Sequence, residues 1–243
     1  SGRIDDVVIS LNISVMFSNE IIPSRCKILT GNVERLGLLN TVTTCMDTDK
    51  LTRVFPSCFD LIMVDAPCSG EGMFRKEEIA VTEWSEDNVE ACAARQRKIL
   101  QDVWDALRPG GILIYSTCTF NRLENEDNAQ WIANTLGAKV LPVVIHPSWG
   151  IVEGNPGYHF YPHKTRGEGF YICALQKQND DISGYVRPLD KRLPKFKPQP
   201  TQPVEQIDVL KTWLKHPDQW VMRQQDRFIV AYPAKYKDLI HIL

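Results

Sequence analysis

The sequence lacks the patterns that mark secreted and membrane proteins. Its 243 residues include seven cysteines, an odd number scattered without a C-x-x-C pair, which argues against a disulfide framework and favours a reducing compartment. No apolar run approaches the roughly 20 residues that a membrane-spanning helix needs, and the first residues lack a signal-peptide pattern. We therefore expect a soluble, cytoplasmic protein without membrane contacts.

An excess of positive charge is also missing. The 28 lysines and arginines are balanced by 30 aspartates and glutamates, which gives a net charge of -2 and a pI near 6.2. A dedicated nucleic-acid module usually has a basic pI or a clear basic stripe. Any contact with nucleic acid must therefore come from local patches.

The order of the predicted elements indicates a doubly wound, Rossmann-like α/β domain. Apolar and β-branched runs predict strands at residues 13–20, 41–47, 59–64, 112–115 and 169–175, and amphipathic spacing predicts helices at 23–37, 85–107 and 125–136. Such nearly continuous apolar runs as 59–64 are typical of buried parallel strands. We expect this domain at residues 1–177, a proline-rich linker at 178–203, and a small α+β extension at 204–243.

Two cysteines follow two of the predicted strands. Cys68 comes shortly after the run that ends at Asp65, and Cys118 follows the run at 112–115. In an open α/β sheet, such positions lie at the carboxyl edge beside a ligand crevice. Both thiols can therefore face one substrate, whereas the other five cysteines are interpreted as small buried hydrophobic residues.

Three acids also stand at strand ends, namely Glu20, Asp47 and Asp65. A carboxylate in such a position can hydrogen-bond the ribose of a nucleoside-containing cofactor, and later acids can meet its base or its reacting end. Each acid could instead simply cap the next helix. Because three occur in succession and a cysteine follows the third, we favour a cofactor crevice.

A zinc site is not indicated. The pair Pro67-Cys68 resembles the Pro-Cys-x-x-Cys zinc motif of nucleobase deaminases, but Glu71 occupies the position of the second cysteine. We therefore expect no metal.

Several motifs together carry a resemblance to a known family. They agree with that family in order and spacing as well as in type, and they run from about Ile13 to Lys177. The motifs are Asp65-Ala-Pro-Cys68-Ser-Gly-Glu-Gly-Met-Phe-Arg-Lys, Trp84-Ser, Gln96-x-x-Ile-Leu, Leu107-Arg-Pro-Gly-Gly, Tyr115-Ser-Thr-Cys118-Thr with Glu124-Asn-Glu126, and Tyr161-Pro-His163 with Gly167-Glu-Gly-Phe-Tyr. The chain resembles the Sun family of S-adenosylmethionine-dependent RNA cytosine-5 methyltransferases, in particular its RsmF-like ribosomal RNA branch.

The resemblance implies an activity and a role for each candidate residue. The reaction is methyl transfer from S-adenosylmethionine to carbon 5 of a cytosine in RNA, with ribosomal RNA as the expected partner. Cys118 matches the nucleophile that adds to carbon 6, and Cys68 matches the residue that helps remove the carbon-5 proton or release the enzyme. Asp65 would contact the base or the methionine end of the cofactor, Glu20 the ribose, and Asp47 the adenine.

Four charged residues have two interpretations each. Arg75 and Lys76 follow the Cys68 loop, where they could contact RNA phosphates or simply be solvated. Glu124 and Glu126 could cap the helix after Cys118, or they could shape the site as the matched family positions suggest. Residues 204–243 resemble the beginning of the RNA-binding extension that the family often carries.

The chain departs from the family pattern at its N-terminal end. The family has a glycine-rich cofactor loop after its first strand, and nothing before Ile13 supplies one, so we expect an N-terminally incomplete domain and an extension that is also cut short. Two alternatives remain open. One is a non-catalytic RNA-binding or ribosome-assembly domain with the same fold. The other is an amino-group methyltransferase, but such enzymes usually carry Asn/Asp-Pro-Pro-aromatic where this chain has Asp65-Ala-Pro-Cys68, and they have no use for Cys118.

Overall fold

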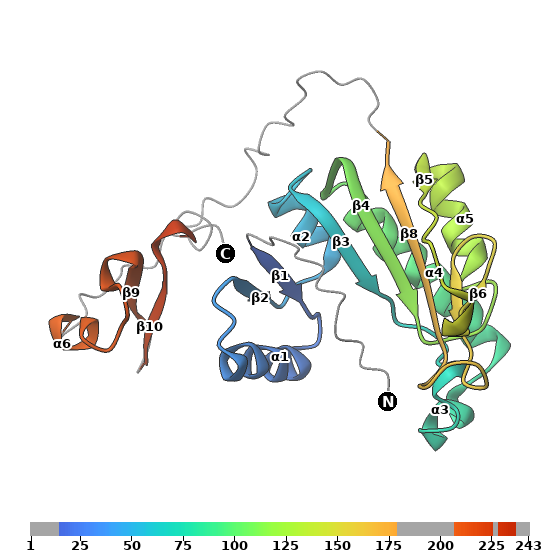
Figure 1. Ribbon diagram of the computed structural model, residues 1–243, viewed down its shortest axis with the longest axis horizontal. Helices are drawn as coiled ribbons and strands as arrows, with labels where there is room; N and C mark the ends of the chain where they lie inside the picture. Colours follow the sequence, from blue (N-terminus) through green and yellow to red (C-terminus); the bar gives the residue numbers. More distant parts are fainter. Residues whose placement is uncertain (1–14, 179–206, 226–227, 237–243) are drawn as a thin grey trace. The chain divides into compact units, whose positions relative to one another are not determined.

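The computed structural model describes residues 15–178, 207–225 and 228–236 (Figure 1). These residues belong to two compact units. Residues 15–47 and the described C-terminal segments belong to the first unit, and residues 48–178 form the second. Both cysteines of interest lie in the second unit.

Residues 15–47 form a strand, a helix and a second strand. β1 (Met16–Asn19) pairs in parallel with β2 (Thr41–Thr44), and α1 (Pro23–Leu36) connects them. The helix begins with a proline, whose fixed φ suits a first turn, and it ends at Gly37, which adopts a left-handed φ of 66° that glycine accepts without strain. The predicted helix at 23–37 is confirmed, and the strands predicted at 13–20 and 41–47 are confirmed over 16–19 and 41–44, with residues 13–14 outside the described part of the chain.

The side chain of Asn19 fastens the carboxyl ends of β1 and β2 to each other. Its Oδ1 accepts hydrogen bonds from Thr44 Oγ1 at 2.8 Å and from the Met46 amide at 3.2 Å. Its Nδ2 donates to the Met46 carbonyl at 2.9 Å. Because Glu20 and Asp47 follow directly in the chain, these bonds fix the points from which both acids project.

The second unit is built on a six-stranded mixed sheet. Its order is β3-β4-β8-β7-β6, and β5 also pairs with β8. β3 and β4 are parallel, whereas β8 runs antiparallel to β4, β5 and β7, and β6 runs antiparallel to β7. The predicted strands at 59–64, 112–115 and 169–175 are confirmed. The strands are β3 (Phe59–Asp65), β4 (Leu107–Thr117), β5 (Ala138–Val140), β6 (Val152–Glu153), β7 (Tyr158–Phe160) and β8 (Phe170–Lys177).

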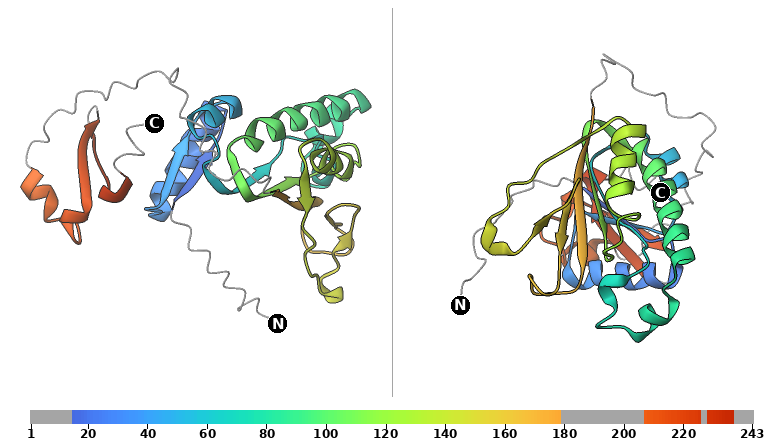
Figure 2. Two further views of the ribbon diagram at one scale, coloured as in Figure 1. Left: turned by 90° about the horizontal axis from the view of Figure 1, so that it is seen from above. Right: turned by 90° about the vertical axis from the view of Figure 1, so that its right-hand side faces the viewer.

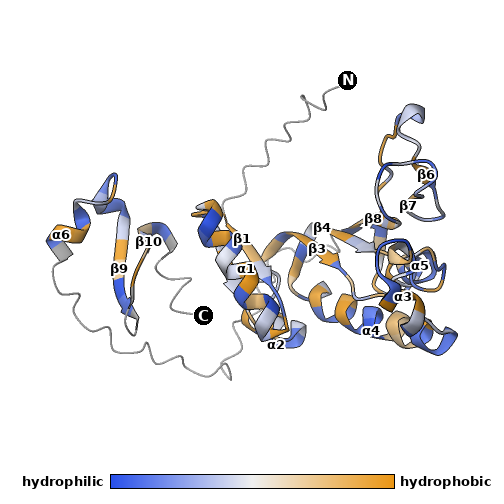
Figure 3. Ribbon diagram, turned by 90° about the horizontal axis from the view of Figure 1, so that it is seen from below, coloured by the Kyte–Doolittle hydropathy of each residue, from blue (hydrophilic) through white to orange (hydrophobic). Residues whose placement is uncertain are grey.

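Two helices cover one face of this sheet, as Figures 1 and 2 show: α4 (Glu86–Trp104) and α5 (Glu126–Thr135). α4 begins where predicted, because Ser85 Oγ accepts a hydrogen bond from the Asn88 amide at 3.1 Å and so caps the first turn. Hydrophobic and hydrophilic stretches alternate along α4 in Figure 3, as expected for a helix that packs on one side only. The unit also contains α2 (Thr48–Val54), α3 (Glu78–Glu83) and 3₁₀ turns at Glu71–Met73 and Pro147–Trp149.

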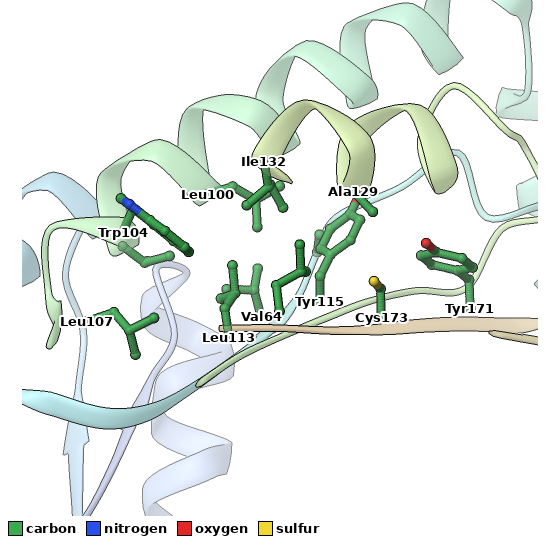
Figure 4. Packing of buried hydrophobic residues seen from close by; sticks show 13 residues of the cluster. Val64, Leu100, Trp104, Leu107, Leu113, Tyr115, Ala129, Ile132, Tyr171 and Cys173 are labelled. Atoms are coloured by element: carbon green, nitrogen blue, oxygen red, sulfur yellow. The ribbon is translucent and has the colours of Figure 1, made fainter. Parts of the chain in front are cut away.

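The core lies between the sheet and these two helices. Leu100 from α4, Ile132 from α5, Leu113 from β4 and Leu175 from β8 are all fully buried, and Figure 4 shows side chains of the helices facing those of the sheet. Burying one such side chain contributes about 1.5–3 kcal/mol. This packing fixes β4 against α4 and α5, and so it sets the position of the residues at the end of β4.

β3 departs from the predicted burial. Val64 is buried, but Leu61 and Met63 are 39% and 61% exposed. Successive side chains of a strand point to opposite faces, so Val64 faces the core while Leu61 and Met63 lie on the other face of the sheet. The prediction that β3 is buried on both faces is wrong for the residues that the structure describes.

The C-terminal segments contain a helix and two strands. α6 (Ile207–Lys211) precedes β9 (Trp220–Gln225), which pairs antiparallel with β10 (Phe228–Pro233), and 3₁₀ turns lie at Pro217–Gln219 and Ala234–Tyr236. These elements agree with the α+β composition expected for 204–243. Nearly all of the predicted linker at 178–203 lies outside the described residues. Across the described ranges, no helix has the length and apolar character that crossing a membrane requires.

Candidate active site

Two parallel strands bring the two cysteines together. Residues Asp65 of β3 and Ser116 of β4 are register partners, so the segments that follow them leave the same edge of the sheet. Cys68 Sγ lies 3.1 Å from Cys118 Sγ, and the Cys118 amide donates a hydrogen bond to Cys68 Sγ at 3.3 Å. Both thiols are partly buried. One small molecule or base at this edge could therefore reach both sulfur atoms.

The contact between the two thiols shifts their pKa values in opposite directions. A hydrogen bond from Cys68 lowers the pKa of Cys118, although burial opposes this effect. Donating that hydrogen bond raises the pKa of Cys68, and burial raises it further. The arrangement favours a thiolate on Cys118 beside a thiol on Cys68, and the thiolate is the nucleophilic form of cysteine.

A close backbone approach fixes the Cys68 loop, which is the segment that follows β3 from Ala66 to Gly72, beside Cys118. The Gly72 amide donates to the Cys118 carbonyl at 2.9 Å, and the Gly169 amide donates to the Gly72 carbonyl at 3.2 Å. A Cβ atom on Gly72 would lie 2.7 Å from the Cys118 carbonyl oxygen and 2.5 Å from that of Gly169. Only glycine fits between these two backbones.

A buried polar network lies behind the Cys68 loop. Glu124, which is fully buried, accepts hydrogen bonds from the Ser69 amide at 3.0 Å, from Ser69 Oγ, and from Gln96 Nε2 at 2.7 Å. Burial raises the pKa of Glu124, and the hydrogen bonds from Ser69 and Gln96 oppose that rise. The sequence did not single out Ser69, because its partners lie far along the chain.

The interpretation of Glu124 and Glu126 as helix caps is wrong. α5 begins after Asn125 without a side-chain cap, and Glu124 instead contacts the Cys68 loop. Glu126 Oε1 lies 2.6 Å from Nε2 of His159, which is almost fully buried. The alternative interpretation, that these acids shape the region around the cysteines, agrees with the contacts of Glu124, whereas the contact of Glu126 is with His159.

The three acids at strand ends lie in different units. Asp65 ends β3 in the second unit, is exposed, and accepts a hydrogen bond from Ser116 Oγ at 3.1 Å. Glu20 follows β1 in the first unit, accepts from the Ile22 amide at 3.0 Å and pairs with Arg25 at 3.0 Å. Asp47 follows β2 in the same unit. Glu20 thus contacts residues at the start of α1, although α1 begins without a side-chain cap.

The two basic residues after the Cys68 loop lie near the surface. Arg75 donates to the Gly167 carbonyl at 2.9 Å and lies 3.5 Å from a Glu168 carboxylate oxygen. The Lys76 side chain is exposed. Arg75 therefore also has a structural role, since it ties the Cys68 loop to the segment before β8.

Aromatic side chains stack in a row that begins with Phe120, two residues after Cys118, and no local sequence pattern predicts such contacts between distant residues. Phe120 stacks on Tyr161 with ring centroids 5.5 Å apart, and Tyr161 stacks on His163 at 5.6 Å. Glu71, which stands where a zinc ligand would, accepts hydrogen bonds from the Phe120 amide and from Trp84 Nε1. Within the described residues, no group of three His, Cys, Asp or Glu side chains is placed to hold a metal ion.

The fold is similar to that of a protein of known structure. The crystal structure of NSun6 from Pyrococcus horikoshii with SFG is 30% identical in sequence, has a TM-score of 0.57, and is matched over 68% of this chain and 42% of that chain. The predicted α/β methyltransferase fold is thereby confirmed.

The sequence comparisons identify the family. The family model for the 16S rRNA methyltransferases RsmB/F matches residues 7–176. Ribosomal RNA small subunit methyltransferase F of Salmonella paratyphi A is 40% identical over 172 residues, which are 69% of this chain and 36% of that protein. The protein of the same name from Salmonella schwarzengrund is 34% identical over 240 residues, 94% of this chain and 49% of that protein.

The chain belongs to the 16S rRNA methyltransferase RsmB/F family, and the resemblance noted in the sequence is confirmed. It spans between about a third and a half of the length of these relatives.

Proposed function

We propose that the protein transfers a methyl group from S-adenosylmethionine to carbon 5 of a cytosine in ribosomal RNA, through a covalent cysteine adduct. The observation that supports this most directly is the pair of thiols 3.1 Å apart at the carboxyl edge of β3 and β4. Family membership supports the RNA substrate and the cofactor. An amino-group methyltransferase would leave this thiol pair without a chemical role.

The donor set suits S-adenosylmethionine. In the first unit, Glu20 and Asp47 follow the parallel strands β1 and β2, and in the second unit Asp65 ends β3, which is parallel to β4; at such strand ends ribose hydroxyls and a cationic amino group find acceptors. Glu20 would hold the ribose, Asp47 the adenine, and Asp65 the methionine end or the target base. Bound there, the cofactor would supply an electrophilic methyl group.

Cys118 would act as the nucleophile. Carbon 5 of cytosine is a poor nucleophile, and addition of a thiolate to carbon 6 converts the ring into an enamine that reacts at carbon 5. The lowered pKa of Cys118 supports this role, because the hydrogen bond from Cys68 favours the thiolate. Asp65 would support the ring as charge develops on it.

Cys68 would act after methyl transfer, as the base that removes the carbon-5 proton. Once Cys118 is bonded to carbon 6, its sulfur is no longer the thiolate that accepts the hydrogen bond of Cys68. The main cause of the raised pKa of Cys68 is then lost, while hydrogen bonds from the amides of Cys118 and Gly70 still favour its thiolate. The two cysteines would thus become reactive one after the other.

Three single variants test this proposal in the protein as a whole. The substrate is 16S rRNA transcribed in vitro, with S-adenosylmethionine labelled on its methyl group. Cys118→Ala should abolish both methyl transfer and the covalent adduct, because the ring is never activated. Cys68→Ala should form the adduct but fail to break it, which leaves a protein-RNA species on a denaturing gel. Cys58→Ala removes an exposed thiol and should behave as the wild type.

Two results would contradict the proposal. If both Cys118→Ala and Cys68→Ala retain full activity, covalent catalysis does not operate, and the amino-group methyltransferase becomes the better hypothesis. If Cys118→Ala traps the adduct and Cys68→Ala loses it, the roles of the two cysteines are reversed.

A further inference from the structure

The Cys68 loop is held from behind by one buried carboxylate. Glu124 comes from the segment between β4 and α5, and its side chain has no solvent exposure. Burying a carboxylate is costly unless hydrogen bonds replace its hydration. Here the replacements are the amide and hydroxyl of Ser69 and the side-chain amide of Gln96. Ser69 is the residue directly after Cys68.

Gln96 holds the residue on the other side of Cys68. Its Nε2, which donates to Glu124, also donates to the Pro67 carbonyl at 2.9 Å. Its Oε1 accepts from Asn128 Nδ2 at 2.7 Å and from the Tyr115 hydroxyl at 2.9 Å. These bonds fix which end of the Gln96 amide faces the loop. Both peptide neighbours of Cys68 are therefore anchored to the same buried network.

The network also reaches the segment that carries Cys118. Ser69 Oγ lies 3.0 Å from Thr119 Oγ1, next to Cys118 in the chain. The Tyr115 hydroxyl contacts the Glu124 carbonyl as well, and Tyr115 belongs to β4. Glu124 thus connects the two segments whose cysteines meet at 3.1 Å.

These contacts match a role in holding Cys68 better than a role in starting a helix. The hydrogen bonds of the Glu124 carboxylate go to the loop after β3 and to α4, and none goes to α5. The amide hydrogens of Ser69 and Gln96 can only donate, and both point to Oε2 of Glu124, at 3.0 and 2.7 Å, while Oε1 accepts from Ser69 Oγ. A carboxylate presents an acceptor oxygen to all three donors and strengthens each bond by its charge, whereas a carboxamide offers one oxygen and an NH₂ group.

We propose that Glu124 is a positioning residue for Cys68: together with Gln96, it holds the Cys68 loop so that the Cys68 sulfur stays aligned for the release step. The inference rests on the proposed function. In that step the Cys68 thiolate takes the proton from carbon 5 and becomes a thiol. The electrons of the broken C–H bond form the carbon 5–carbon 6 double bond, and the bond from carbon 6 to Cys118 breaks, which returns a thiolate to Cys118.

The variant Glu124→Gln tests this inference in the full protein. It keeps the size of the side chain but removes its charge, which weakens the bonds from the amides of Ser69 and Gln96, and its NH₂ group displaces the hydrogen that Ser69 Oγ donates. In a single turnover, methyl transfer should stay close to that of the wild type. Over many turnovers the rate should fall by about tenfold or more, since small misplacements of catalytic groups have large effects, and the adduct should accumulate.

A double variant separates positioning from a general structural effect. If Glu124 acts through Cys68, Glu124→Gln should add nothing to the adduct level or to the release rate in a Cys68→Ala background, because the group that it positions is gone. The matched control is Glu126→Gln. Glu126 is also largely buried and lies two residues further along the chain, at the start of α5, but its partner is His159, so this variant should not accumulate the adduct.

Ser69→Ala keeps the test decisive if Glu124→Gln does not fold. This variant removes the hydroxyl contacts with Glu124 and Thr119 and leaves the amide bond to Glu124 in place. It should accumulate the adduct to an intermediate level, between those of the wild type and Cys68→Ala.

The inference is overturned if the folded Glu124→Gln variant, or Ser69→Ala in its place, accumulates no more adduct than Glu126→Gln. It is also overturned if Glu124→Gln loses methyl transfer in the first turnover. In either case, an adduct trapped by Cys68→Ala would leave the proposed function standing. Loss of the adduct in all variants and in the wild type would instead count against the covalent mechanism, and with it against this inference.

Discussion

The substitution Gly72→Ala tests whether the close backbone approach holds the Cys68 loop beside Cys118. An added Cβ would lie 2.5 Å from the Gly169 carbonyl oxygen and 2.7 Å from that of Cys118. Ordinary contacts of a Cβ atom begin at 3.4 Å, so the backbones must separate by about 0.7–0.9 Å. All of these neighbours are backbone atoms, which cannot rotate away as a flexible side chain would.

Both stability and activity should fall in this variant. Forcing a methyl group into a packed region costs about 1–3 kcal/mol, which should appear as a lower midpoint of unfolding in urea. A shift approaching 1 Å at the Cys118 carbonyl should also lower the rate of methyl transfer by about 10²-fold, because the thiolate leaves its reactive position. Tryptophan fluorescence and methyl incorporation into 16S rRNA measure the two effects.

The matched control is Gly31→Ala. Gly31 lies inside α1, and a Cβ added there meets nothing within 4 Å. Alanine favours a helix interior over glycine by about 0.5–1 kcal/mol, so this variant should be slightly more stable and fully active. Gly72→Ala could instead unfold at the same urea concentration as the wild type and keep its activity within about twofold. In that case the close approach of Gly72 to the backbones of Cys118 and Gly169 does not constrain the site.

Three further predictions follow from other parts of the molecule. The pKa of Cys118 is lowered, whereas partial desolvation of the otherwise exposed Cys58, together with the Asp60 carboxylate, raises the pKa of Cys58. Iodoacetamide should therefore alkylate Cys118 with a rate that rises at lower pH than for Cys58, as followed by peptide mass spectrometry; identical profiles would contradict the assignment of the thiolate. Leu113→Ala, at a fully buried position, should cost about 2–5 kcal/mol of unfolding free energy, and a loss below about 1 kcal/mol would mean that the core closes around the gap. Arg75→Ala with Lys76→Ala should reduce the salt dependence of RNA affinity measured by filter binding, whereas an unchanged slope would show that neither residue contacts phosphate.

The sequence predicted local structure well where a residue acts on its own neighbourhood. Pro23 and Gly37 mark the two ends of α1 through their backbone preferences, and Ser85 marks the start of α4. By contrast, α2 was not predicted. It is only seven residues long, and its threonines bond to Asp102 of α4, through Thr48 Oγ1 at 2.8 Å and Thr52 Oγ1 at 2.7 Å. No local pattern contains such a tertiary contact.

The site was predictable to a smaller extent. The strand ends correctly indicated that Cys68 and Cys118 meet, because parallel neighbouring strands deliver their carboxyl ends to one edge. The direction of β8 was not evident, since an apolar run does not show whether a strand is parallel or antiparallel. The contacts of Glu124 were also hidden, because Ser69 and Gln96 lie 55 and 28 positions away in the sequence.

The short distance between the two sulfur atoms has a practical consequence for oxidation chemistry. A disulfide requires a separation of about 2.0 Å, and the thiols already lie 3.1 Å apart. A peroxide that oxidises one thiol therefore has the second within reach as the partner that completes a disulfide. That bond would occupy both the proposed nucleophile and the proposed base at once, so we expect the protein to need a thiol reductant during storage and assay, and to recover when one is added.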